Sequence, residues 1–553
     1  MRAATALYAT ILCVALAQAA PGSGAPPPAL AAEGSQQLFS LPKTSGAGKR
    51  VLIIGAGTAG VAALKALLVD LPEESRRDWE VTVFEQRSSA GGVWLADNVT
   101  HPEPPELPDT PLYPDLTTNT PHPIMTIPRF PFRPETPLFP KHTAVWQYHN
   151  DILAHFNLTS HVHFDTRVVE TRWLDNRWLV YTDDGSHTTR LSEFDNLIVA
   201  NGHFHYPLEP TFPGRTEWEN AAPGRTIFHS IYFRDASSFA GKNVVVVGGS
   251  ASGQDVAKHA LKYANSTTIS VKSVPYRDRN APLDIPGAAK KPALSHFTAN
   301  SVVFEDGSEL TGIDIVVLAT GYEVRIPFLT QGDVLSVDVH RDPKKQGSSL
   351  STNLRYIRPV WRHIFALDPA LPPTALSFVG LPVFVNNGPS SYATGLLIAH
   401  ALANPSLLPT HEEALRELEE REAALRAAGL DSEYVGHRLI ALPGEEEPAG
   451  LAHSDATIRY LQERGLAGLS GIPPLGQNYT EPWRRRATEN AFVLRRAWQR
   501  IRDAGEEQKW VSGVSTIEEW DELIGRLIEW EKEQQGDSFD PLPSAGDYDF
   551  EYY

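Results

Sequence analysis

A chain of 553 residues is too long for one hydrophobic core, so we expect two or three domains. Its composition, 42% hydrophobic and 21% charged, is that of an ordinary soluble globular protein. Asp and Glu outnumber Lys and Arg by 67 to 49, and the net charge of -18 argues against a nucleic-acid partner, because neutralising phosphates requires a basic surface.

The first twenty residues have the features of a secretory signal peptide. Arg2 precedes an uncharged apolar run, and Ala17-Gln18-Ala19 offers small residues at the spacing that a signal peptidase requires. We predict a signal at residues 1–20 and a flexible Pro/Gly/Ala-rich leader at 21–48. The protein would then be secreted or reside in the ER or vacuolar lumen. Sequons fit N-glycosylation there, at Asn98, Asn157, Asn265 and Asn478. An uncleaved anchor is the alternative, but the run is barely long enough to span, so we expect no stable membrane anchor.

The pattern of an α/β protein begins at Lys49. Val51 to Ile54 predicts a buried strand, a helix is expected from about Ala59 to Val69, and Val81 to Phe84 predicts a second strand. Residues 100–140 are dense in proline and should form an ordered covering loop, because long loops in compact proteins usually carry function or cover a site.

The turn between this first strand and helix is Gly55-Ala56-Gly57-Thr58-Ala59-Gly60. Glycines permit the tight turn and a close approach to a pyrophosphate, for which the helix N-terminus supplies amide donors. Glu85 follows the second strand, where a carboxylate can bind a ribose hydroxyl. These features predict an FAD site at Gly55, Ala56, Gly57, Ala59, Gly60 and Glu85.

A second strand-turn-helix unit begins at Asn243. Its turn is less typical, because Ser250 replaces the middle glycine. No carboxylate follows the next strand; Lys272 and Ser273 stand there instead, with Arg277 close behind. Cations suit the 2′-phosphate of NADPH, although they would also fit a solvated loop. The candidate NADPH residues are Gly248, Ser250, Ala251, Ser252, Gly253, Lys272, Ser273 and Arg277.

A strand from Ile313 to Ala319 closes the region of this second unit, and the chain becomes helical and charged from about Thr410. Thr410 and Glu413 have the spacing of a capping box, which predicts a helix to about Ala428. Thr516 and Glu519 predict a second such start.

Taken together, the segments in this order resemble the flavin-containing monooxygenase family from about Lys49 to Leu408. They are Gly91-Gly92-Val93-Trp94, Leu116-Thr117-Thr118-Asn119, Phe164-x-Thr166-x-Val168, Val199-Ala200-Asn201-Gly202-His203 and Leu318-Ala319-Thr320-Gly321-Tyr322. The resemblance implies cofactor contacts for Gly92, Trp94, Thr118, Asn119, Val168, Thr320 and Gly321.

The chain departs from the family pattern at three places. Gly224 lies one residue too far before His229 for the family's FxGxxxHxxx(Y/F) identifier, and Asn201 stands where the family usually has Thr. Asn386 to Ser390 lacks the Gln expected against the flavin. These changes leave cofactor binding expected but put the substrate in doubt.

The resemblance implies an α/β fold with two Rossmann-like domains, the NADPH domain (211–312) inserted between two parts of the FAD domain (49–210 and 313–409), and a helical C-terminal extension (410–553). It also implies a mechanism in which NADPH reduces FAD, and O2 forms a C4a-hydroperoxyflavin that oxygenates a nitrogen or sulfur atom of a small molecule. Asn119 is the candidate catalytic residue, as a donor that fixes the flavin and nicotinamide; its alternative is an ordinary turn asparagine before Pro121.

Other functions remain open. A Baeyer–Villiger-type oxygenase or a peroxide-releasing oxidase could use the same scaffold, and a secreted glycoprotein could keep the fold without turnover. The histidines show no metal-ligand spacing on a helix, so we expect no metal site. Cys13 is the only cysteine and would leave with the signal, which excludes a disulfide reductase.

Overall fold

The computed structural model of the protein describes residues 48–98, 102–185, 189–272, 285–341, 347–445 and 447–536. The expected signal and nearly all of the leader therefore lie outside the described residues. All four sequon asparagines are exposed at the surface. Secretion and glycosylation stay predictions.

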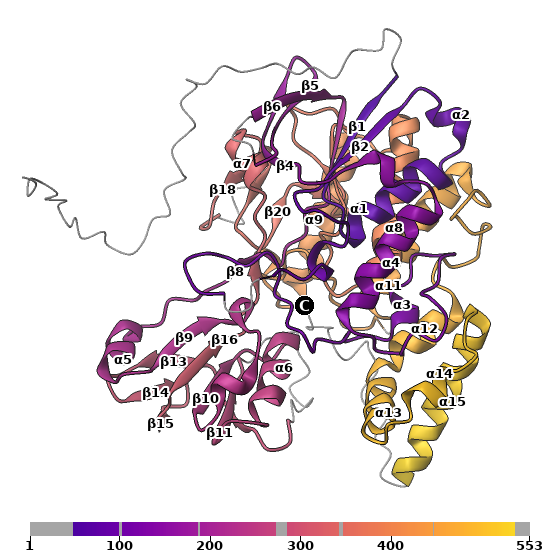
Figure 1. Ribbon diagram of the computed structural model, residues 1–553. Coiled ribbons are helices and arrows are strands. Elements are labelled where there is room, and N and C mark those ends of the chain that lie inside the picture. The colour runs from indigo at the N-terminus through magenta and orange to yellow at the C-terminus, as the bar shows by residue number, and fades with distance from the viewer. Residues whose placement is uncertain are drawn as a thin grey trace, which may run out of the picture. The chain divides into compact units, whose positions relative to one another are not determined.

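The first domain is built on a seven-stranded sheet (Figure 1). In sheet order its strands are β21 (Val360–Trp361), β22 (Phe365–Ala366), β23 (Leu376–Phe378), β7 (Asn196–Val199), β1 (Arg50–Ile54), β2 (Glu80–Phe84) and β3 (Val162–His163). The strands from β23 to β3 are parallel, and β1 is buried along nearly its whole length at the centre. Such two-sided burial explains the unbroken apolar run at residues 51–54.

Helices cover one face of this sheet. They include α1 (Thr58–Lys65), which a π-helical turn (Ala66–Asp70) continues, α4 (His142–His155) and α8 (Asn387–Ala403). Gly395 of α8 has no room for a side chain, because a Cβ atom would lie 3.0 Å from the Cα atom of Ala63 in α1. On the other face lies an antiparallel sheet of β4 (Arg167–Leu174), β5 (Arg177–Asp183) and β6 (Thr189–Phe194), with α7 (Pro327–Gln331).

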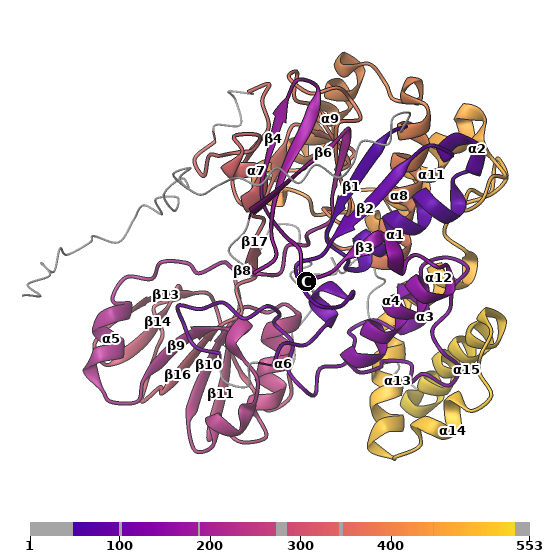
Figure 2. The ribbon, with the colours of Figure 1, turned by 45° about the horizontal axis from the view of Figure 1, so that its top comes forward.

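The second domain has its own parallel sheet, seen at the lower left of Figure 2. In order its strands are β12 (Ala289–Lys291), β11 (Ser266–Ser270), β10 (Asn243–Val247), β16 (Ile315–Leu318) and β9 (Thr226–His229). Helices α5 (Arg215–Ala221) and α6 (Ala251–Ala260) and a second sheet of β13 (Leu294–Phe297), β14 (Ser301–Phe304) and β15 (Glu309–Thr311) complete it. Since β16 pairs with β10, this sheet extends past the predicted boundary at residue 312.

The chain passes between the two domains twice, at adjacent places. β8 (Tyr206–Pro207) leads into the second domain and pairs antiparallel with β17 (Tyr322–Glu323), which leads out of it. The α/β fold with two Rossmann-like domains, one inserted in the other, is therefore confirmed. Short remaining elements of the first domain are α2 (Glu73–Arg76), α3 (His122–Met125), β18 (Ser336–Val337), β19 (Ser351–Thr352) and β20 (Ile357–Arg358).

The C-terminal extension is helical, as expected. Its helices are α9 (His411–Ala427), α10 (Ser432–Val435), α11 (Ala449–Leu461), α12 (Pro482–Glu489), α13 (Ala491–Asp503), α14 (Glu507–Val511) and α15 (Ile517–Gln535). Both predicted capping boxes are present, at Thr410–Glu413 and Thr516–Glu519. Among the described helices, none is both long and apolar enough to cross a membrane.

Candidate active site

The first glycine-rich turn connects β1 to α1 and leaves space where a ligand would lie. Gly55 has a φ of +103°, and a Cβ atom there would lie 2.5 Å from the carbonyl oxygen of Ala200. At Gly60 a Cβ atom would lie 1.9 Å from the carbonyl oxygen of Gly55. Gly57 differs, because its φ of -77° is an ordinary value and the nearest atom to a Cβ there would be the Cα atom of Gly92, at a van der Waals distance of 3.4 Å. The fold thus requires glycine at Gly55 and Gly60. It does not require glycine at Gly57, so the space beside Gly57 is available to a pyrophosphate.

Glu85 lies at the carboxyl end of β2, directly beside this turn. Its two carboxylate oxygens accept hydrogen bonds from the amides of Ala56 (2.7 Å) and Arg87 (2.9 Å). Burial raises the pKa of Glu85, while these two amide donors lower it. Each oxygen keeps a second acceptor position for a ribose hydroxyl. The turn and its acid therefore form one unit, and ribose binding by Glu85 stays a prediction.

The other predicted flavin contacts of this domain lie around the same turn. Gly92, with a φ of +52°, packs against Gly57, and Trp94 ends the same short 3-10 turn. The amide of Thr166 donates to the carbonyl oxygen of Glu85 at 2.9 Å. Val168 is the second residue of β4, which follows Thr166, and its side chain is buried in the core.

The second turn repeats the first, position for position. The amide of Gly248 donates to the last residue of β11 as Gly55 does to the last residue of β2, at 2.9 and 2.8 Å. Ser250 has a φ of -77° and a ψ of -174°, nearly the backbone of Gly57. Gly253, like Gly60, has no room for a Cβ atom. Ser250 therefore leaves the turn intact. Ala251 and Ser252 open α6 from the same turn.

The structure places Lys272 at the expected end of β11, while Ser273 and Arg277 lie outside the described residues. Lys272 is exposed, and its Nζ atom lies 5.6 Å from the ring centroid of Tyr434 on α10. The guanidinium of Arg355 lies 4.9 Å from the same ring. Tyr434 and Arg355 were not predicted, because they come from distant parts of the chain.

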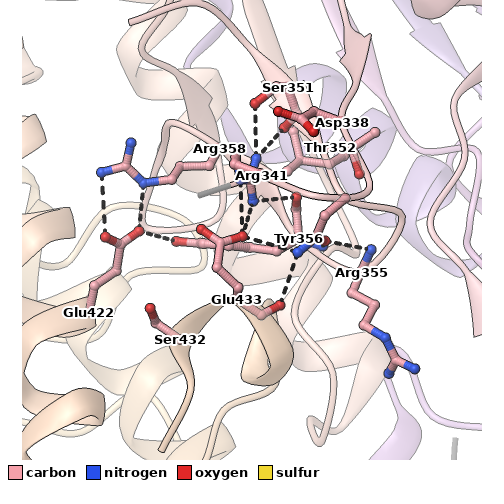
Figure 3. Close-up of polar contacts among 12 residues, drawn as sticks. Asp338, Arg341, Ser351, Thr352, Arg355, Tyr356, Arg358, Glu422, Ser432 and Glu433 are labelled. Atoms are coloured by element: carbon pink, nitrogen blue, oxygen red, sulfur yellow. Dashed lines mark hydrogen bonds and ion pairs between the residues drawn. The ribbon is translucent and has the colours of Figure 1, made fainter. Parts of the chain in front are cut away.

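A polar network holds α10 in this place (Figure 3). The side chain of Glu433, next to Tyr434, accepts hydrogen bonds from Arg341 (3.0 Å) and Asn353 (3.0 Å). Nearby, the buried pair of Arg358 and Glu422 is joined at 2.7 Å. The network thus fixes the aromatic ring beside Lys272.

Asn119 lies in the covering loop, where two loop segments pair. The amide of Thr118 donates to the carbonyl oxygen of Pro140 (2.9 Å), and its hydroxyl donates to the carbonyl oxygen of Thr120 (2.8 Å). The amide of His142 donates to the carbonyl oxygen of Leu116 at 3.2 Å. The Oδ1 atom of Asn119 is buried, yet it accepts no hydrogen bond from the residues that the structure describes. A buried acceptor without a donor is costly, so this atom is suited to a ligand donor.

The covering loop is also tied to the second domain. Before Asn119, the Tyr113 hydroxyl donates to Asp255 of α6 at 2.9 Å, and Arg495 of α13 lies 3.5 Å from the other oxygen of that carboxylate. Arg234 donates to Asp97 at 3.1 Å and to the carbonyl oxygen of Thr110 at 2.9 Å. These partners come from distant parts of the chain, so no local pattern predicts them.

Thr320 and Gly321 lie where the chain leaves the second domain. The carbonyl oxygen of Gly321 accepts hydrogen bonds from the amide of Leu208 (2.9 Å) and from Nε2 of His229 (3.0 Å), while the Thr320 hydroxyl donates to the carbonyl oxygen of Leu208. Burial lowers the pKa of His229 to about 4, so its ring is neutral. Its Nδ1 accepts from the amide of Ile231, which leaves the proton on Nε2. The imperfect family identifier thus still supplies a histidine at the domain junction.

Comparison with known proteins agrees with this geometry. The sequence model of a family described as "Flavin-binding monooxygenase-like" matches residues 48–276 and 284–341, more than half of the chain. The chain belongs to this family. Flavin-containing monooxygenase FMO GS-OX-like 2 of Arabidopsis thaliana is 30% identical over 414 residues, which cover 70% of this chain and 81% of that protein. FMO GS-OX2 of the same plant is 28% identical over 413 residues, which cover 72% of this chain and 83% of that protein.

Two solved structures share the fold. S-allyl-L-cysteine S-oxygenase from Allium sativum has a TM-score of 0.64 and 24% identity, covering 88% of this chain and 99% of that one. Tmm from Pelagibacter sp. strain HTCC7211 has a TM-score of 0.56 and 22% identity, covering 82% of this chain and 90% of that one. This flavin-binding monooxygenase-like protein is therefore an oxidoreductase, and its family implies a flavin and NADPH. Among the described residues, no group of His, Cys, Asp and Glu is placed to hold a metal ion.

Proposed function

We propose that this enzyme uses FAD, NADPH and O2 to place one oxygen atom on a nitrogen or sulfur atom of a small molecule. The observation that carries the proposal is a pair of matching turns followed by side chains of opposite charge. Glu85 follows β2 at the first turn, and Lys272 follows β11 at the second. Asn119 is held in the covering loop. A carboxylate suits a plain ribose and a cation suits a 2′-phosphate.

The residues present fit both dinucleotides. Gly57 leaves space for a pyrophosphate at the start of α1, and Glu85 keeps free acceptor positions. The Oδ1 atom of Asn119 has no donor among the described residues and can accept a hydrogen bond from a ligand. FAD, when bound, supplies the redox chemistry that moves electrons from NADPH to O2. No side chain needs to act as a nucleophile.

The side chains of the protein bind and orient the cofactors and the substrate, and they exclude water from the site. Asn119 can accept through Oδ1 and donate through Nδ2, so one side chain can fix two neighbouring groups. The covering loop holds Asn119 through the pairing of 116–118 with 140–142. A fixed, dry site favours oxygen transfer to substrate over loss of H2O2.

A screen of amines, thioethers and ketones with isotopically labelled O2 tests the reaction. We expect one labelled oxygen atom in an N- or S-oxygenated product for each NADPH consumed. A labelled ester from a ketone would instead show a Baeyer–Villiger-type oxygenase, and H2O2 without any oxygenated product would show an oxidase.

Replacing Lys272 by alanine should reduce the preference for NADPH over NADH. A charge-assisted contact contributes about 1.5–3 kcal/mol, so the ratio of kcat/KM with NADPH to kcat/KM with NADH should fall about 10- to 100-fold. Only the value with NADPH should change. Flavin reduction rates measured with each coenzyme give this ratio. Lys262, exposed at the end of α6, is the control, since its replacement should leave the ratio unchanged. Equal rates with both coenzymes in the wild type would contradict the assignment.

A further inference from the structure

Helix α12 lies in the C-terminal extension, outside the residues that the family model matches. Arg484 and Thr488 stand one turn apart on this helix, so they share a face. Both are buried, with 1% and 2% of their surface exposed. The helix packs against α3, as Figure 2 shows. A buried arginine is costly unless its donors are satisfied, so its partners indicate its role.

The partners of Arg484 belong to the segment that follows Asn119. Its Nη1 atom donates to the carbonyl oxygens of Pro123 (3.1 Å), Ile124 (3.0 Å) and Thr126 (3.3 Å). These carbonyls belong to α3 and the residue after it, and that of Pro123 also accepts from the hydroxyl of Thr126 at 2.7 Å. Glu481 balances the charge, with 2.8 Å between its Oε2 and the Nε of Arg484. One guanidinium therefore fastens the chain a few residues beyond Asn119.

Thr488 contacts the other side of the expected flavin site. Its hydroxyl accepts a hydrogen bond from Nδ2 of Asn386 at 2.9 Å and donates to the carbonyl oxygen of Arg484 at 2.8 Å. Asn386 directly precedes α8. In the first turn of α8, a Cβ atom on Gly388 would lie 2.0 Å from the carbonyl oxygen of Met125. The end of α3 and the start of α8 thus meet at one point, and α12 contacts both.

A second contact from the extension supports the same placement. The ring of Trp520 on α15 lies 4.5 Å from the ring of His122, the first residue of α3, in a perpendicular arrangement. Burial lowers the pKa of His122 to about 3, so this ring is neutral and packs as an apolar group. The extension therefore holds α3 at both ends.

We propose that Arg484 and Thr488 are positioning residues of the active site, which act through α3 and α8 to hold Asn119 and Asn386 in place. The proposal rests on the function proposed above. Loss of either contact should loosen the covering loop and admit water, so that NADPH is consumed with less oxygen transfer. The helical extension would then be part of the catalytic apparatus.

The test compares Arg484→Met and Thr488→Val with a matched control on the same helix. Arg486 is the control, because among the described residues its guanidinium forms its hydrogen bonds and ion pair with Asp521 of α15, within the extension. At equal FAD occupancy, we expect Arg484→Met and Thr488→Val to release at least threefold more H2O2 per NADPH than wild type, while Arg486→Met behaves as wild type. Arg484→Lys should restore part of the coupling, since it keeps the charge and a donor.

A second measurement does not depend on turnover. Arg129 in the covering loop has a side chain that is 58% exposed and is followed by Phe130, so trypsin can report on the loop by cleaving after it. Cleavage there should be faster in Arg484→Met and Thr488→Val than in Arg486→Met. If Arg484→Met fails to fold, Thr488→Val decides, because it removes a single hydroxyl. Wild-type coupling and wild-type cleavage in Thr488→Val would overturn the proposal. A wild-type enzyme that makes no oxygenated product would refute the proposed function instead, while the cleavage rates would still report on α12.

Discussion

Replacing Gly57 by valine is expected to give a folded but colourless protein. The backbone at Gly57 is one that any residue adopts, and a Cβ atom would meet its nearest neighbour, the Cα atom of Gly92, at 3.4 Å. The second turn shows that this backbone accepts a side chain, since Ser250 has almost the same angles. The methyl groups of valine would instead occupy the space for the FAD pyrophosphate, which needs close backbone approach. Flavin absorbance per protein and the melting temperature measure both effects.

Two neighbouring variants separate loss of cofactor from loss of fold. Gly57→Ala should keep the fold and bind FAD more weakly, because it adds only the Cβ atom. Gly60→Ala should destabilise the fold, since its Cβ atom would lie 1.9 Å from the carbonyl oxygen of Gly55. Full flavin occupancy in Gly57→Val, with wild-type stability, would show that this turn does not hold the cofactor.

Much of this fold could be predicted from sequence because its signals are local. The turn at 55–60 needs glycine at Gly55 for a φ of +103° and at Gly60 for close packing, and both needs lie within six residues. The capping box at Thr516 likewise joins residues three apart. Periodicity and turn chemistry therefore placed the two dinucleotide units and the helical extension correctly.

The contacts that complete the site could not be predicted, because they join distant residues. Arg484 stands in the run Trp483-Arg484-Arg485-Arg486, which in sequence resembles a solvated basic surface. Its acceptors lie 358 to 361 residues earlier in the chain. Asp255 similarly brings together Tyr113 and Arg495 from two other parts of the chain. The only signal in the sequence was the spacing, since Arg484 and Thr488 share a helical face with the buried Ala487.

Asn119→Ala is expected to bind FAD and consume NADPH but to transfer little oxygen. The hydrogen bonds that pair 116–118 with 140–142 are made by other residues than Asn119, so the loop should keep its path. Alanine removes an amide whose Oδ1 is buried and lacks a partner among the described residues, and it leaves space for water. Water in a site that must stay dry diverts oxygen to H2O2. We expect most of the NADPH consumed to appear as H2O2, measured against oxygenated product in the same reaction.

Thr136→Val is the matched control for a disturbed loop. Its hydroxyl donates to the carbonyl oxygen of Arg133 at 2.7 Å within the same loop, so the variant removes a loop hydrogen bond that does not involve Asn119. The control should lower stability slightly, by about 1 kcal/mol for one lost hydrogen bond, and should keep wild-type coupling. If Asn119→Ala also keeps wild-type coupling, Asn119 is only a turn residue before Pro121. If both variants lose the coupling of NADPH consumption to oxygen transfer equally, this coupling depends on the order of the loop and not on the amide of Asn119. Only selective loss in Asn119→Ala assigns the orienting role to its side chain, because the two variants differ in which bond they remove and not in the loop they disturb.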